Sequence, residues 1–111
     1  MRIAVAASDD EKYAEHFGRA QKFLIYDFDE ENLEFMEIRE SLKVPGEKHQ
    51  WGKSLDVLKD CDVVICAQIG INAKPGLKKM GKTVVEDEGT VEEVLERFRK
   101  HQIFLSKPLK F

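Results

Sequence analysis

The stretch that organises this chain is SDDEKYAEHFGRA, which runs from Ser8 to Ala20. It separates two apolar runs, residues 3–7 and 23–28, which we predict to be buried strands. A loop of this length is more than a hairpin needs, since most hairpin loops take about two to five residues. Long polar loops on a rigid scaffold are a common place for functional residues. We therefore expect the functional part of the molecule to include this loop.

His16 stands near the end of the loop and is followed by Phe17, Gly18 and Arg19. Neutral imidazole is the commonest metal ligand among side chains. A glycine such as Gly18 also lets a bulky ligand approach the backbone. The residues alone leave a second interpretation open, in which His16 and Phe17 only fold the loop onto its own strand.

Composition predicts one globular domain. The chain has 111 residues, of which 42% are hydrophobic and 35% charged. Its net charge of −3 argues against nucleic acid as a partner, because phosphate binding requires a basic surface. No apolar run approaches the length of a membrane span, and the first residues show no signal-peptide pattern. We expect a cytoplasmic protein.

The remaining apolar patterns continue an α/β chain. A third strand, rich in charge, suits the edge of a sheet. Later segments alternate between the helical period and short apolar runs typical of buried parallel strands. A capping box of Thr90 and Glu93 begins the last helix. The predicted order is β-β-β-α-β-α-β-α, with the later elements at residues 33–40, 50–59, 62–67, 72–81, 83–86 and from 90 onward.

Right-handed crossovers then predict a five-stranded mixed sheet of order 3-2-1-4-5, in which strands 4 and 5 are parallel to strand 1. Open α/β sheets bind ligands where connections leave in opposite directions, here between strands 1 and 4. The loops at residues 8–20 and 68–72 should meet there. Gly70 and Asn72 in the second loop precede a helix whose N–H groups suit a small anion. A plain structural loop is an equally open interpretation.

The other candidate ligands are weaker. Cys61 and Cys66 lie five residues apart on one predicted strand and should face opposite sides of the sheet, which excludes a shared metal. We expect Cys66 to be a small buried side chain. His49 precedes the first predicted helix, where an exposed histidine is the simpler interpretation. Carboxylates in the first loop are expected to form a solvated surface rather than a cation site: Asp9, Asp10, Glu11 and Glu15.

Several motifs together resemble the dinitrogenase iron–molybdenum cofactor biosynthesis family. They are Ser8-Asp9, HFGRA at residues 16–20, FLIYD at residues 23–27, DVVI at residues 62–65, Ile69-Gly70 and GTVEE at residues 89–93. The resemblance covers nearly the whole chain and implies a ribonuclease-H-like fold over residues 1–101. It also implies binding or carriage of an iron–sulfur or iron–molybdenum–sulfur cluster, with His16 as the direct ligand.

We expect a non-catalytic accessory protein that meets metallocluster donor and acceptor proteins, as a monomer or homodimer. Phe17, Gly18, Arg19, Gly70 and Asn72 would surround the cluster, and Arg19 would balance its negative charge. Nucleases of the ribonuclease-H-like fold need carboxylates for two metal ions, and the first and fourth strands here offer none.

The alternative function is a non-metal regulatory or partner-binding module with a small-anion crevice. Residues 102–111 form an apolar tail beyond the domain, and we expect it to dock on the chain itself or on a partner subunit, because so many apolar side chains are unfavourable in water.

Overall fold

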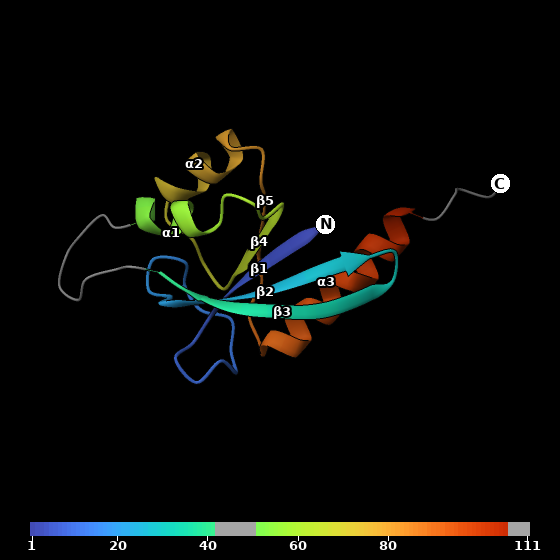
Figure 1. The fold of residues 1–111 in the computed structure, drawn as a ribbon. Coiled ribbons are helices and arrows are strands. Elements are labelled where there is room, and N and C mark those ends of the chain that lie inside the picture. The colour runs from blue at the N-terminus through green and yellow to red at the C-terminus, as the bar shows by residue number, and fades with distance from the viewer. Residues whose placement is uncertain (42–50, 107–111) are drawn as a thin grey trace.

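The computed structural model describes residues 1–41 and 51–106, apart from the side chain of Trp51. In this part of the chain the strands and helices follow the predicted order (Figure 1). Their bounds are β1 Arg2–Ala7, β2 Lys22–Asp29, β3 Asn32–Glu40, α1 Trp51–Val57, β4 Val63–Cys66, α2 Ala73–Lys79, β5 Thr83–Glu86 and α3 Val91–Ser106. None of the helices in these residues has the length and apolar character needed to cross a lipid bilayer.

The strands form one mixed sheet in the order β3-β2-β1-β4-β5, which confirms the predicted topology. β1 pairs antiparallel with β2 and parallel with β4, and β5 is parallel to β4. β1 occupies the centre because both of its faces are apolar, with Ile3 and Val5 on one side and Ala4 and Ala6 on the other. Since its side chains are used in packing, β1 contributes to a site only through the loop that follows it.

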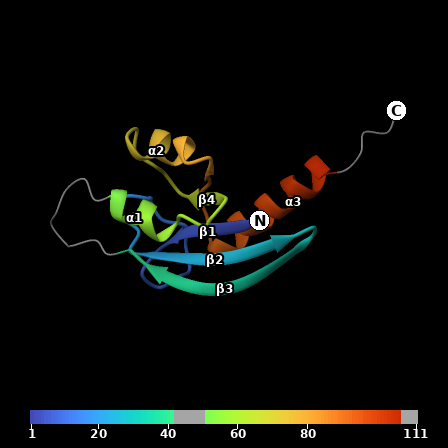
Figure 2. The same cartoon turned by 45° about the horizontal axis from the view of Figure 1, so that its top comes forward.

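Helices cover the two faces of the sheet unequally (Figure 2). α1 and α2 lie on one face, where Leu77 and the turn residue Leu58 belong to a core cluster with Ala4 and Ala6. α3 alone packs on the opposite face, against Ile3 and other residues of β1, β2 and β4. The α3 face therefore has less cover than the other face.

The helix ends follow from local sequence. The N–H of Thr90 donates to the Glu93 carboxylate at 3.0 Å, and the N–H of Glu93 donates to the Thr90 hydroxyl at 3.1 Å, which confirms the capping box. Gly81 follows α2 with a φ of +79°, a left-handed conformation that suits glycine after a helix. α3 continues to Ser106, so residues 102–106 of the predicted tail are helical. Docking of residues 107–111 lies outside the described residues, as does His49.

Edge strand β3 has two chemically different faces. On the α3 side, Phe35 is paired with Tyr26 in the register and Ile38 with Leu24. On the opposite side, Arg39 forms hydrogen bonds with Asp60 that include one of 2.8 Å. β3 thus has an apolar face, on which Leu33 packs against the core and Phe35 and Ile38 are exposed, and a charged face that is bonded to the rest of the domain.

A guanidinium pair stabilises that charged side. Arg39 and Arg2 both bond the carboxylate of Asp60, and Arg2 also bonds Asp27 at 3.1 Å. The hydrogen bond from Arg39 is the largest cause that holds the pKa of Asp60 well below its usual range. This network connects β1, β2 and β3 to the turn before β4.

The prediction that Cys61 and Cys66 face opposite sides of the sheet is wrong. β4 begins at Val63, so Cys61 precedes the strand. Both thiols are buried in the same cluster on the α1 and α2 face, with exposed fractions of 2% and 0%. Burial of Cys66 as a small side chain is confirmed.

Candidate functional site

The loop after β1 begins with a tight turn made by its own polar side chains. The Ser8 hydroxyl bonds the Asp10 carboxylate at 2.6 Å, and the N–H of Lys12 donates to the same carboxylate at 3.1 Å. These bonds lower the pKa of Asp10, with the Ser8 bond as the largest cause. Glu11 has a φ of +65° and pairs with Lys22 at 3.1 Å. Asp10 and Glu11 thus stabilise the turn through these bonds.

The second half of the loop is held between the ends of β1 and β4. The N–H of Glu15 donates to the carbonyl of Ala6 at 2.8 Å, and the N–H of Ala67 donates to the carbonyl of Glu15 at 2.9 Å. The N–H of Phe17 then donates to the carbonyl of Gln68 at 2.8 Å. The predicted crevice between these strands is therefore occupied by backbone of the loop itself, and a ligand would have to bind on the outer surface of this segment.

Phe17 anchors the segment to the hydrophobic core. Its side chain is 0% exposed, and its ring centroid lies 5.8 Å from that of Phe23 on β2. Ala20 is also buried in the same cluster. We predicted that Phe17 would be among the residues around the cluster, but the structure gives its ring a packing role beneath the site.

His16 lies half-buried on the outer side of this anchor, beside the exposed residues Gly18 and Arg19. The N–H of Gly18 donates to Nδ1 of the imidazole at 2.9 Å. In a neutral ring with this bond, Nδ1 is the acceptor and the proton resides on Nε2. The His16 backbone is fixed as well, because its N–H donates to the Glu15 carboxylate at 2.7 Å and its carbonyl accepts from Arg19 at 3.0 Å. The ring is thus oriented before any ligand arrives.

Residues 68–72 adjoin this segment through the bond between Phe17 and Gln68. Gly70 and Asn72 are exposed, and Ile71 is 89% exposed. Asn72 makes no side-chain cap bond to α2, which spans only seven residues. A Cβ built at Gly70 meets nothing within 4 Å, so packing does not require glycine there. The geometry brings the two predicted loops together, whereas the anion site at the start of α2 has no polar side chain arranged for it.

Thiolate ligands are not available at this surface. Burial raises the pKa of Cys66 to about 12, with Glu86 as a further cause, and burial raises the pKa of Cys61 to about 11. Across residues 1–41 and 51–106, no group of three or more His, Cys, Asp or Glu side chains is arranged to hold a metal ion. His16 is therefore a single candidate ligand rather than one of a set.

Two features of this site were not predicted from the sequence. Glu15 supplies both the backbone bonds that insert the loop and the carboxylate that accepts from His16. Ile71 is apolar and almost fully exposed, directly beside the candidate residues Gly70 and Asn72. For Ile71 the available signal was an apolar residue in a predicted loop, between the candidate residues Gly70 and Asn72. No local pattern indicates the backbone bonds of Glu15, because their partners are distant in the chain.

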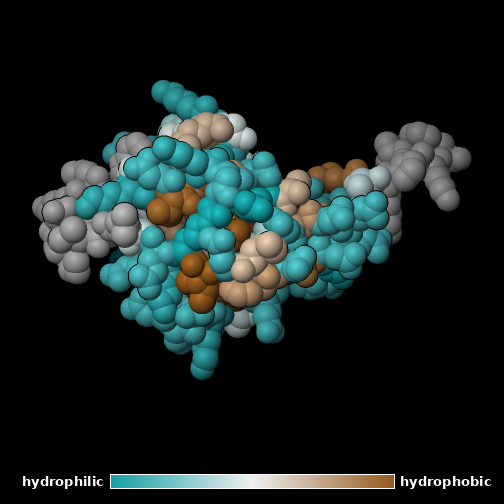
Figure 3. Space-filling view, in the orientation of Figure 1, coloured by the Kyte–Doolittle hydropathy of each residue, from teal (hydrophilic) through white to brown (hydrophobic). Residues whose placement is uncertain are grey.

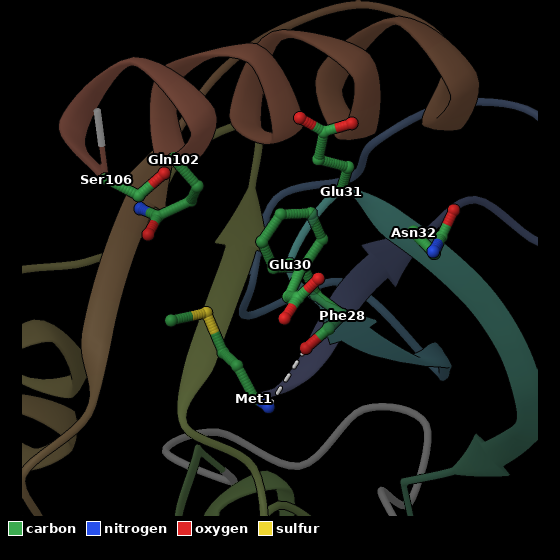
Figure 4. A pocket seen from close by; sticks show the side chains of 7 residues that line it. All are labelled: Met1, Phe28, Glu30, Glu31, Asn32, Gln102 and Ser106. Atoms are coloured by element: carbon green, nitrogen blue, oxygen red, sulfur yellow. Dashed lines mark hydrogen bonds between the residues drawn. The ribbon is translucent and has the colours of Figure 1, made fainter. Parts of the chain in front are cut away.

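A separate hollow of about 560 Å³ lies at the other end of β1. Figure 4 shows that its lining comes from the chain start, the turn between β2 and β3, and the end of α3. The amino group of Met1 donates to the Phe28 carbonyl there at 3.1 Å. Because β1 separates this hollow from the loop of His16, it does not belong to the candidate site.

Comparisons with known proteins identify the family. The family described as dinitrogenase iron-molybdenum cofactor matches residues 1–101. The chain is 32% identical over 95 residues to the FeMo cofactor biosynthesis protein NifB of Chlorobaculum tepidum, covering 84% of this chain and 22% of NifB. It is 28% identical over 100 residues to protein NifX of Azotobacter vinelandii, covering 86% of this chain and 63% of NifX. The chain thus spans less than two thirds of either relative.

Solved structures of similar sequence share the fold. The crystal structure of PH0822 matches with a TM-score of 0.75 and 27% identity, over 91% of this chain and 92% of that one. The apo form of the orange protein (ORP) from Desulfovibrio gigas matches with a TM-score of 0.70 and 28% identity, over 91% of this chain and 88% of that one. The chain therefore belongs to the dinitrogenase iron–molybdenum cofactor family, which is tied to the biosynthesis of that cofactor.

Proposed function

We propose that this protein binds or carries an iron–sulfur or iron–molybdenum–sulfur cluster, or a precursor of one, as a non-catalytic accessory protein in metallocluster assembly. The cluster is its cargo, and its partners are the proteins that deliver and receive that cargo. Membership of the family supports the pathway. The observation that carries the binding role is the half-buried imidazole of His16 on the outer side of a segment bonded to both β1 and β4.

The donor set favours a preassembled cluster over a bare metal ion. A bare zinc ion takes three or four protein ligands, whereas the described residues include no group of three His, Cys, Asp or Glu donors that could hold one. A preassembled iron–sulfur cluster brings its own sulfides, which already fill part of the coordination of each iron before the cluster meets a carrier. A site with few ligands also suits cargo that must be released.

His16 is the proposed direct ligand, and its neighbours have distinct roles. Ligation through Nε2 requires the ring proton to move to Nδ1, which breaks the bond from the Gly18 N–H. The exposed guanidinium of Arg19 would balance the negative charge of the cargo. Gly70 and Asn72 would form the border of the same surface. Phe17 supports the surface from the core and makes no contact with the cargo.

The test is an anaerobic titration of the full chain with an iron–sulfur and with an iron–molybdenum–sulfur cluster, followed by visible absorbance and metal analysis. His16→Ala should weaken binding at least about tenfold, which corresponds to 1.4 kcal/mol, with little change in the melting temperature of the apo protein. His101→Ala is the matched control, because His101 is an exposed histidine on α3.

Equal affinity of His16→Ala and the parent would remove His16 as the ligand. If the parent protein binds neither cluster but does bind inorganic phosphate, the alternative of an anion-binding regulatory module replaces this proposal. Loss of stability in His16→Ala without loss of binding would assign the histidine to loop packing.

A further inference from the structure

The hollow of about 560 Å³ at the start of β1 combines apolar and acidic side chains, and we call it the Met1 hollow. Met1 and Phe28 supply its apolar lining, and Met1 is 52% exposed. Glu30 and Glu31 line it from the turn between β2 and β3 (Figure 4). Ser106, the last residue of α3, also belongs to the lining. The Met1 hollow therefore extends from this turn to the point at which α3 ends.

The charges around the Met1 hollow leave carboxylates in excess. Glu30 and Glu31 supply two carboxylates, and the amino group of Met1 supplies one positive charge. Arg99 on α3 is also attracted by Glu31, but its guanidinium is paired with Glu96 at 3.0 Å. A segment that carries positive charge and apolar side chains would thus find partners for both in this hollow.

The turn itself does not explain the carboxylate of Glu30. This residue has a φ of +56°, a left-handed conformation in which glycine or asparagine is favoured over other residues. A turn of the same shape would form more readily with either of them. The carboxylate at this position therefore calls for a partner outside the turn.

The sequence places a suitable segment at the border of the hollow. α3 ends at Ser106, and residues 107–111 continue the chain from there as KPLKF. Pro108 disfavours helical backbone at the residue before it, so the sequence predicts that the direction of the helix ends there. Leu109 and Phe111 are apolar, and the two lysines are positively charged. Five residues span up to about 17 Å when extended, and Ser106 already lines the hollow.

A second groove beside α3 fits this segment less well. Figure 3 shows hydrophobic surface around the end of α3, and a groove of about 530 Å³ lies there between β5 and α3, lined by Val85 and Leu105 among others. Its carboxylate, Asp87, already accepts two hydrogen bonds from Arg97 at 2.8 and 3.2 Å. His101 also lines this groove. Lysines would gain no unpaired carboxylate from its lining, so charge favours the Met1 hollow.

We propose that residues 107–111 of this chain dock in the Met1 hollow. The side chains of Leu109 and Phe111 cover its exposed apolar lining, and the two lysines lie beside the carboxylates of the turn. The end of α3 is thereby joined to the turn between β2 and β3, which α3 already contacts where Arg99 donates to the Glu31 carbonyl at 3.1 Å. The Met1 hollow is at the opposite end of β1 from the loop of His16, and the inference does not depend on the proposed cargo.

The probe is the ε-methyl group of methionine in the full chain, labelled with carbon-13 and followed by NMR. The chain has three methionines, and only Met1 lines this hollow. Met36 and Met80 are 44% and 42% exposed and serve as internal controls. Nuclear Overhauser contacts are expected between the Met1 methyl group and the ring of Phe111. Their relative intensity should not depend on protein concentration, because the segment and the hollow belong to one chain.

Matched double variants test the apolar contacts. Leu109→Ser with Phe111→Ser should shift the methyl signal of Met1 and leave those of the other two methionines unchanged. Phe104→Ser with Leu105→Ser is the control, because these α3 residues are 72% and 60% exposed and do not line the Met1 hollow. It should leave the Met1 signal in place. Circular dichroism establishes that both double variants are folded.

Glu30→Asn tests the role of charge without disturbing the turn, since asparagine tolerates a positive φ. It should reduce the intensity of the contacts between Met1 and Phe111. Added salt should reduce the same contacts in the parent, because the attraction between exposed charges is screened. Contacts that neither Glu30→Asn nor salt weakens would overturn the choice of this hollow.

Three further results would overturn the inference. The first is the absence of contacts between Met1 and Phe111 in the parent, and the second is an equal shift of the Met1 signal in the two double variants. Contacts of Phe111 with Val85 would instead place the segment in the groove beside β5. Contacts that become stronger as the protein concentration rises would also contradict it, because they would assign the segment to a second copy of the chain.

Discussion

The backbone N–H of Gly18 donates a hydrogen bond of 2.9 Å to Nδ1 of His16. The ring lies close against Gly18, since a Cβ built there would stand 3.2 Å from Cε1 and 3.3 Å from Nδ1 of His16. Gly18 thereby determines both the orientation of the imidazole and the nitrogen that carries its proton. Its lack of a side chain serves the histidine, in addition to the predicted approach of a ligand.

Gly18→Ala should change the state of the His16 ring while leaving the fold intact. The added methyl group is closer to the ring than ordinary contact allows, so the ring must move by a few tenths of an ångström, which lengthens and weakens the bond to Nδ1. Nitrogen-15 NMR of the ring should show a loss of the pattern typical of a proton on Nε2. The free energy of unfolding should change by less than about 1 kcal/mol, because the site is exposed. Gly70→Ala, where the Cβ meets nothing within 4 Å, is the control. An unaltered ring spectrum in Gly18→Ala would contradict this account of Gly18.

Phe17→Ala should be among the most destabilising substitutions in the loop. It removes a fully buried ring that packs on Phe23, and such a deletion costs about 3–5 kcal/mol. The measurement is equilibrium unfolding in urea. Arg19→Ala is the control, since an exposed side chain in the same loop should change stability by no more than about 0.5 kcal/mol. A similar small effect for Phe17→Ala would mean that the loop is not anchored by its aromatic ring.

Cys66 should resist thiol reagents in the native protein. Its pKa is raised to about 12 from an ordinary value of 9.0, so the reactive thiolate is scarce and buried. Because the folded pKa is the higher one, the stabilising contribution is present below pH 9 and declines as the pH rises toward 12. Rates of thiol labelling with and without urea test whether the native fold protects Cys66 from the reagents. Urea unfolding of the parent and of Cys66→Ala across the alkaline range tests the pH dependence of stability. The variant should lose less stability than the parent as the pH rises.

Asp60→Asn should reduce the sensitivity of the fold to acid. Arg39, and then Arg2, hold the pKa of Asp60 below its ordinary value of 3.8. Its stabilising contribution is therefore complete above that value and is lost as the pH falls through it toward the lower folded pKa. At neutral pH the cost should be only about 1 kcal/mol, because the side chain is 45% exposed.

The measurement for Asp60→Asn is urea unfolding at neutral pH and at several values below about pH 4. Asp56→Asn provides the comparison, since Asp56 pairs with Lys59 at 3.6 Å and is 73% exposed. It should change neither the neutral stability nor the acid response. Identical acid profiles for the parent and Asp60→Asn would show that the guanidinium pair does not stabilise the fold.

The sheet could be predicted because its signals are local. β1 is apolar on both faces, which requires a central position, and the helix that precedes β4 requires a parallel crossover. The position of Cys61 could not be predicted in the same way. β4 begins only at Val63, after a turn in which the N–H of Cys61 bonds the carbonyl of Leu58 and the Asp62 carboxylate accepts from Arg2. Neither this local turn bond nor the long-range bond from Arg2 has a counterpart in the apolar pattern.

The location of the candidate site could be predicted from the sequence, but the contacts that hold its residues in place could not. The order of strands brings residues 8–20 and 68–72 to the same end of the sheet, as expected. The sequence pattern did not indicate that Phe17 would be directed into the core, because an aromatic residue beside a histidine suits either side of a loop. Nor did it indicate that Glu15 would bond to both neighbouring strands, since those bonds involve only the backbone.

Those backbone bonds also affect the time scale on which this surface can change. The amides of Glu15, Phe17 and Ala67 are bonded to distant segments in the manner of a short additional strand, so their hydrogen exchange should require opening of the sheet rather than local fraying. A loop that is fixed on this scale cannot release a bound molecule by swinging away. Transfer would then proceed by competition at an immobile surface, with the rate set by the incoming acceptor.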